Sequence, residues 1–171
     1  MSKQSFRQAA ACNASKTTIE AFAADFARKV GYRPGAELEP VVAQLGGRII
    51  YQTLADLSRS PEASIRVFGD RKFEIYLPDY TSGERDRFSI AHEIGHYILH
   101  YPLANEPMIA ARFGSTRVEW EANWFAAGFL MPEAEFRKQF ARHPKNIAGV
   151  ARHFRVSAAA ATARAKALDL L

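Results

Sequence analysis

The chain has 171 residues, of which 48% are hydrophobic and 24% charged, values typical of one globular domain with its own core. No apolar run approaches the roughly 20 residues that cross a bilayer, so we expect no membrane segment. The net charge of +5 arises from basic residues scattered along the chain, which favours a solvated basic surface over a nucleic-acid-binding patch.

The first 16 residues are polar and rich in alanine, and they contain no apolar segment of a secretory signal. Cys12 lies here and is the chain's single cysteine, so an internal disulfide is impossible. We therefore expect residues 1–16 to be a flexible leader and the protein to be cytoplasmic.

The next part of the chain predicts two helices and then a small sheet. Residues 17–30 place apolar side chains at helical spacing before Gly31, and a shorter helix over 37–45 is closed by a Gly-Gly pair. Segments rich in β-branched and aromatic residues then predict three strands, the last two forming a hairpin: 48–51, 63–68 and 73–77.

The second half of the chain predicts helices. Thr81 and Glu84 fit a capping box, and nothing interrupts the helical pattern until the residue before Pro102. Four further helices follow, over 116–130, 132–140, 145–154 and 157–168. These elements predict an α+β fold that is mainly helical with a three-stranded sheet, in which residues 17–140 form the main domain and 141–171 a C-terminal helical extension packed on it.

A metal-binding motif lies in the helix before Pro102. His92 and His96 are four residues apart, so a helix places both imidazoles on one face, able to bind the same ion. Glu93 projects about 100° further round the helix, where it can reach a metal-bound water as a general base without binding the metal itself. The H-E-x-x-H pattern therefore predicts a zinc site with His92 and His96 as ligands and Glu93 as the catalytic residue.

A catalytic zinc ion usually takes three protein ligands and keeps one position open. Glu119, on the next helix, is our preferred third ligand, with Asn123 one turn away to hydrogen-bond a ligand imidazole. Two other interpretations of this helix remain open: Glu121 as the ligand, and Glu119 as the partner of Thr116 in a capping box. His100 lies one more turn along the helix that carries His92 and His96. Three ligands spaced along a straight helix are too far apart to bind one ion, so we expect His100 to support the site without binding the ion.

The segments 87–100 and 119–132 resemble the ImmA/IrrE family of metallopeptidases, and the resemblance extends more loosely over residues 17–168. It implies a zincin-like, gluzincin-type domain in which the first glutamate of E-x-E-A-N, here Glu119, is the third zinc ligand. It also implies that the protein cleaves a helix-turn-helix transcriptional repressor and so relieves repression. Mn²⁺ could replace Zn²⁺ in a site of nitrogen and oxygen donors.

Two other functions compete with peptide hydrolysis. Residues 146–168 read like a helix-turn-helix, but the second helix opens with four alanines that offer no hydrogen bonds to base edges, which argues against direct nucleic-acid binding. A zinc-containing interaction module with little catalysis is the other alternative. For the peptidase, we further expect an extended substrate to add to an exposed edge of the strand at 73–77.

Overall fold

The computed structural model describes residues 5–59, 63–81, 83–111 and 114–171. Within them the α-helices are α1 (Lys16–Lys29), α2 (Glu39–Gln44), α3 (Leu54–Arg59), α4 (Gly83–His100), α5 (Arg117–Leu130), α6 (Glu133–Arg142), α7 (Ile147–Phe154) and α8 (Ala158–Ala167). The strands are β1 (Arg7–Gln8), β2 (Gly47–Gln52), β3 (Ile65–Gly69), β4 (Lys72–Pro78) and β5 (Met108–Ala110). The fold is thus mixed and mainly helical, as predicted.

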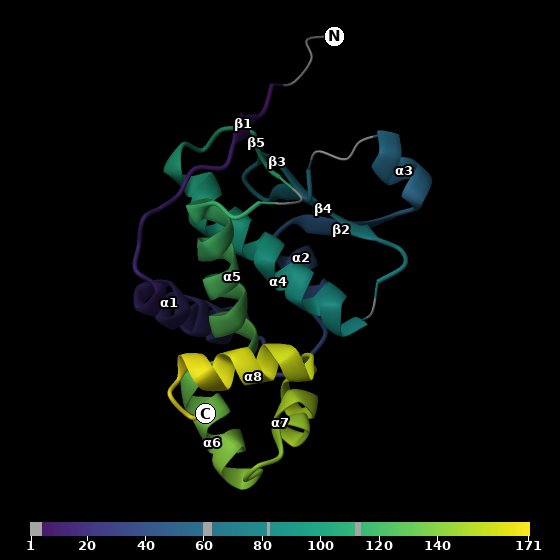
Figure 1. Cartoon of the computed structure of the whole chain (residues 1–171). Coiled ribbons are helices and arrows are strands. Elements are labelled where there is room, and N and C mark those ends of the chain that lie inside the picture. Colours follow the sequence, from purple (N-terminus) through teal and green to yellow (C-terminus); the bar gives the residue numbers. More distant parts are fainter. Residues whose placement is uncertain (1–4, 60–62, 82, 112–113) are drawn as a thin grey trace.

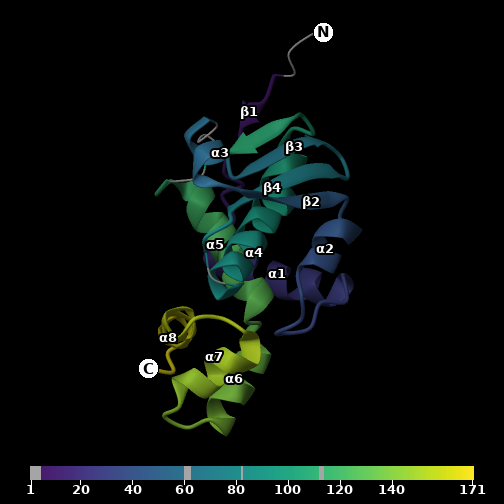
Figure 2. The same cartoon turned by 90° about the vertical axis from the view of Figure 1, so that its right-hand side faces the viewer.

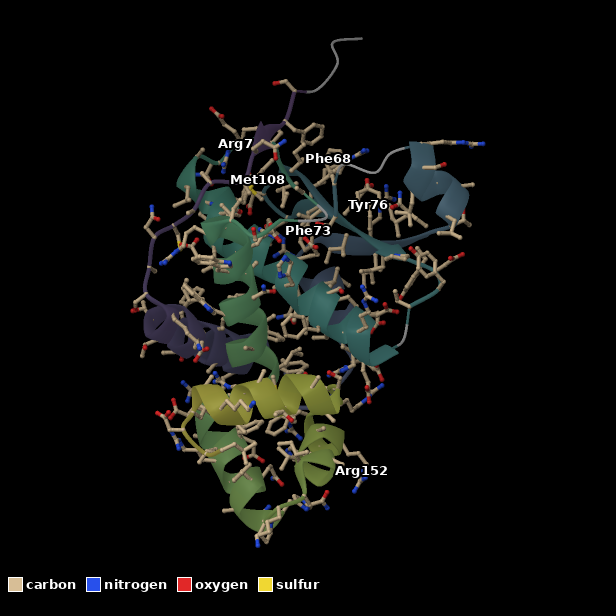
Figure 3. The ribbon with its side chains drawn as sticks, in the orientation of Figure 1. Arg7, Phe68, Phe73, Tyr76, Met108 and Arg152 are labelled. Atoms are coloured by element: carbon tan, nitrogen blue, oxygen red, sulfur yellow. The ribbon has the colours of Figure 1, made fainter. Side chains whose placement is uncertain are left out.

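The sheet has five strands in the order β1-β5-β3-β4-β2, so the prediction of three strands was wrong. The predicted hairpin is present, because β3 and β4 are antiparallel and Arg71 takes a left-handed turn conformation with φ 53°. β1 lies inside the expected leader and pairs in parallel with β5, Arg7 opposite Met108 (Figure 3). Strands of two and three residues are too short for alternation to show in a sequence.

Strand β4 lies inside the sheet, which overturns the expected substrate position. It pairs in parallel with β2 over its length and antiparallel with β3 on its other side. On the side away from β2, β3 covers residues 72–75 and the Tyr76 amide donates to the Ser64 carbonyl, so residues 73–76 offer no free edge to which a substrate could add.

Helices α4 and α5 pack side by side at the centre of the molecule, between the sheet and α1 (Figure 1). Gly95 makes the close approach possible, since a Cβ there would lie 3.1 Å from the Phe125 side chain. Phe125 and Phe129 on α5 are fully buried in the core and stack with each other. The two helices that carry the candidate site residues are therefore held against each other by a core of aromatic side chains.

Helices α6, α7 and α8 gather at the end of the molecule away from the sheet (Figures 1 and 2). Arg164 of α8 is buried and donates hydrogen bonds to the Met131 carbonyl at 3.1 Å and to Glu20 of α1 at 2.7 Å. Among the described residues, no helix is both long and apolar enough to span a membrane.

Candidate metal centre

Three side chains from two helices converge on one point. His92 and His96, one turn apart on α4, have Nε2 atoms 3.0 Å apart, and each Nε2 faces the carboxylate of Glu119 in the first turn of α5. The His92 Nε2 to Glu119 Oε2 distance is 3.1 Å, and that from His96 Nε2 to Oε1 is 3.2 Å. The structure thus brings together the three residues that the sequence analysis selected as ligands.

The spacing of these three donors suits a metal ion. Ligands placed 2.0–2.1 Å from a tetrahedral zinc lie roughly 3.3 Å from one another, close to the separations found here. Two imidazoles and one carboxylate are also the donor set of a gluzincin-type site. Among the described residues, His92, His96 and Glu119 form one of the groups whose donor atoms lie close enough together to hold an ion.

The alternative role for Glu119, a capping box with Thr116, is not adopted. Thr116 is the N-cap of α5, but its side chain makes no cap hydrogen bond. The Glu119 carboxylate lies against His92 and His96 instead. Burial alone would raise its pKa, but the hydrogen bonds with these two imidazoles lower the pKa of Glu119 to about 2, so the group is anionic at neutral pH.

The two imidazoles of the cluster are in different electrostatic environments. Burial lowers the pKa of His96 to about 4, against the opposing influence of Glu119, so His96 is neutral at physiological pH. For His92 burial acts in the same direction, but the hydrogen bond with Glu119 and the charge of Glu93 outweigh it and raise the pKa above its ordinary value. A neutral ring is the form that binds a metal ion.

Asn123 supports His92 from the side opposite the metal position. Its Oδ1 lies 2.9 Å from Nδ1 of His92, and it is one helical turn from Glu119 on α5. An amide oxygen only accepts, so Nδ1 carries a proton, and in the neutral ring, the form that binds a metal ion, Nε2 has its lone pair toward the site. Such a contact is the expected role of Asn123.

His96 is supported by a second, fully buried chain of contacts. Its Nδ1 lies 3.0 Å from Nδ1 of His100, and His100 Nε2 lies 2.9 Å from Oε2 of Glu121. His100 therefore lies directly behind a ligand imidazole. Glu121 had been considered as a ligand, yet it points away from the three-residue cluster and into this chain.

Glu93 is buried, with 4% of its surface exposed, and lines a pocket of about 370 Å³. Residues of β4, α3 and α4 also line the pocket, including Tyr76 and Ser89, together with Tyr80 from the segment between β4 and α4. A carboxylate that lines a pocket beside a candidate metal centre is placed to exchange protons with a molecule bound there.

Sequence alone did not choose among five residues that could stabilise an oxyanion: Tyr76, Tyr80, Tyr97, Tyr101 and His100. Tyr76 and Tyr80 line the pocket that reaches Glu93. The Tyr97 hydroxyl instead accepts a hydrogen bond from the Arg71 amide at 3.0 Å, and His100 belongs to the buried chain behind His96. The Tyr76 hydroxyl donates to the Glu74 carboxylate, so Tyr80 is the pocket tyrosine that the geometry favours.

Two basic residues of the helix-turn-helix-like pair α7 and α8, Arg155 and Arg164, are engaged within the protein. Arg164 has a relative exposure of 3% and donates its hydrogen bonds to Glu20 and to the Met131 carbonyl. Arg155 donates to the Gly35 carbonyl at 3.1 Å and forms an ion pair with Glu37 at 2.5 Å. These two arginines are therefore committed to internal contacts rather than to a nucleic-acid backbone.

Comparison with known proteins gives a family match and a structural match. The family model of the M78 peptidases, described as the IrrE N-terminal-like domain, matches residues 56–166. No curated protein matches the chain. A solved structure of a Mycobacterium tuberculosis transcriptional regulator superimposes with a TM-score of 0.59 at 18% identity, covering 86% of this chain and 46% of that one. The chain thus spans less than half of that regulator, and the likeness shows the fold.

Proposed function

Because the chain belongs to the M78 peptidase family of the IrrE N-terminal-like domain, as the motifs predicted, we propose that it is a metal-dependent endopeptidase with a His92, His96 and Glu119 metal centre. The observation that carries this proposal is the convergence of two imidazole nitrogens and one carboxylate within 3.0–3.2 Å of one another. Zn²⁺ is the ion that this donor set fits best, and Mn²⁺ is the alternative.

The bound ion would supply Lewis acidity that activates a water molecule and polarises the scissile carbonyl. Glu93 is the residue that takes the proton from the attacking water at its carboxylate and then delivers it to the leaving amine. Because Glu93 is 4% exposed in the pocket lining, little bulk water competes for that proton. Tyr80, which lines the same pocket, is our candidate for the donor of a hydrogen bond to the developing oxyanion.

The proposed substrate is a helix-turn-helix transcriptional repressor, whose cleavage would relieve repression. This substrate class comes from the resemblance to the ImmA/IrrE family, and it requires a cytoplasmic location. A regulator of similar fold in Mycobacterium tuberculosis is compatible with a role in transcriptional control.

The test is incubation of the full chain, loaded with Zn²⁺, with candidate repressors, followed by mass spectrometry of the repressor. We expect a single cleavage event that a chelator abolishes and that the Glu93→Gln variant does not perform. Because Glu93 is not a ligand, Glu93→Gln should still bind Zn²⁺ with wild-type stoichiometry. Cleavage by Glu93→Gln at the native rate would contradict the assignment of Glu93.

The second candidate function is a zinc-containing interaction module that binds the repressor without cutting it. It would use the same group of His92, His96 and Glu119, so metal content alone does not distinguish it from the peptidase. A stable complex with intact repressor, formed by both wild type and Glu93→Gln, would support the module and exclude the peptidase. The internal engagement of Arg155 and Arg164 argues against a DNA-binding role.

A further inference from the structure

The carboxylate of Glu121 is fully buried and accepts four hydrogen bonds. Oε2 receives the backbone amide of Cys12 at 2.8 Å and Nε2 of His100 at 2.9 Å. Oε1 receives the amide of Asn13 at 2.8 Å and Nε of Arg117 at 3.0 Å. Every acceptor position of the carboxylate is thus used, and all four donors belong to residues other than the three proposed ligands.

These contacts determine where the protons lie on two histidines. Since Glu121 only accepts, Nε2 of His100 donates to it, and a neutral His100 then has a bare Nδ1 that accepts. The atom 3.0 Å away is Nδ1 of His96, which must therefore donate. A His96 ring protonated at Nδ1 has its lone pair on Nε2, the nitrogen that faces His92 and Glu119.

We propose that Glu121 is a positioning residue of the metal centre. Acting through His100, it sets the tautomer and the orientation of the His96 ring, and the N-terminal segment around Cys12 and Asn13 completes its environment. The inference rests on the proposed metal centre. It adds to that centre the backbone amide of Cys12, which is 109 residues from Glu121 in the sequence.

Cys12, His100 and Glu121 could be interpreted instead as a second metal site, since their donor atoms also lie within 4.8 Å of one another. The hydrogen bonds decide against this. An ion bound to Oε2 and His100 would have to remove the His100 hydrogen bond and compete with the Cys12 amide for that oxygen, and it would lie near the positive Arg117 guanidinium that binds Oε1 of the same carboxylate. The cluster supports the metal centre rather than forming one.

The test compares Zn²⁺ affinity of full-length variants, measured by competition with a chromogenic chelator. In Glu121→Gln an amide nitrogen replaces one oxygen and in either orientation points at two donors, so two of the four hydrogen bonds are lost together with the negative charge that holds His100 in place. We expect Zn²⁺ to bind about 10- to 100-fold more weakly. Glu20→Gln is the matched control, because it alters a carboxylate paired with buried Arg164 away from the centre, and its Zn²⁺ affinity should stay within about threefold of wild type.

A pair of variants at His100 separates positioning from simple packing. Gln at this position carries an acceptor for His96 and a donor for Glu121, whereas Leu carries neither. We expect His100→Gln to keep most of the Zn²⁺ affinity and His100→Leu to lose it to the same degree as Glu121→Gln. If Glu121→Gln does not fold, the difference in Zn²⁺ affinity between His100→Gln and His100→Leu still tests whether the contacts behind His96 position its ring.

The direct readout is the ¹⁵N chemical shift of the His96 ring in the metal-free protein. Wild type should show the tautomer protonated at Nδ1, and Glu121→Gln and His100→Leu a mixture. Wild-type Zn²⁺ affinity and an unchanged tautomer in both variants would overturn the inference while leaving the proposed function intact. Failure of the wild-type protein to bind Zn²⁺ at His92 and His96 would overturn the proposed function itself.

Discussion

At the scale of single residues, the candidate site consists of atoms whose protonation is decided by their neighbours. Glu119 is held anionic by two imidazoles, and Asn123 fixes the His92 ring with its lone pair toward the centre. The convergence of His92, His96 and Glu119 could be predicted from sequence, because H-E-x-x-H on a helix and a glutamate on the next helix each have a geometric consequence. The role of Glu121 could not, since it depends on a contact with residues 12 and 13 that no local pattern encodes.

Removal of the Asn123 side chain tests the support of His92. In Asn123→Ala, the His92 Nδ1 proton loses its acceptor and the ring is free to turn, so we expect Zn²⁺ affinity to fall about 10- to 100-fold. Asn146→Ala is the control: it removes the cap of α7 and should cost about 1 kcal/mol of stability without changing Zn²⁺ affinity. Equal Zn²⁺ affinity in both variants would argue against a supporting role for Asn123.

The buried carboxylate of Glu121 predicts a pH dependence of stability. Burial would raise its pKa, but hydrogen bonds from the Cys12 amide, Arg117 and His100 prevail and lower it from 4.5 to about 2. A lowered carboxyl pKa gives stability that is fully present above pH 4.5 and is lost as the pH falls toward 2. In urea unfolding of the metal-free protein, the stability gap between wild type and Glu121→Gln should therefore narrow across this window. A gap that is constant with pH would refute this assignment of charge.

At the scale of elements, the site depends on close helix packing around α5. Helix positions were predictable from apolar spacing and caps, and α1, α4 and α5 differ from the predicted ranges by only a few residues at their ends. The short strands β1 and β5, and the interior place of β4, were not predictable, because strand order depends on pairings distant in sequence. The same limit explains why the expected substrate edge at 73–77 was wrong.

Gly128 is the position at which α5 approaches α1 most closely. A Cβ there would lie 2.6 Å from the backbone carbonyl oxygen of Glu20, which has no room to yield without shifting the helix. We expect Gly128→Ala to lower the free energy of unfolding by about 1–3 kcal/mol. Gly83→Ala, at a glycine whose added Cβ meets nothing within 4 Å, should leave it nearly unchanged in the same urea titration. Equal stabilities of the two variants would mean that the helices have space to separate.

At the scale of the whole molecule, buried arginines connect parts that are far apart in sequence. Arg87 of α4 is 5% exposed and donates to the carbonyls of Ala36 at 2.6 Å and Arg155 at 3.1 Å. Arg164 joins α8 to Glu20 of α1 and to Met131. We therefore predict that residues 141–171 unfold together with the rest of the chain.

Calorimetry tests this cooperativity. Wild type should show one transition, and Arg164→Met should lower its free energy of unfolding by about 3 kcal/mol while keeping a single transition, because the variant leaves the Glu20 carboxylate without its buried partner. Two separate transitions in either protein would mean that the C-terminal helices form an independent unit.

The account as a whole depends on where an ion binds. Anomalous X-ray diffraction from a crystal of the full chain grown with Zn²⁺ tests this most directly. The predicted result is a single strong peak within bonding distance of His92 Nε2, His96 Nε2 and the Glu119 carboxylate. A peak between Cys12, His100 and Glu121 instead, with none at the first position, would contradict both the metal centre and the role assigned to Glu121.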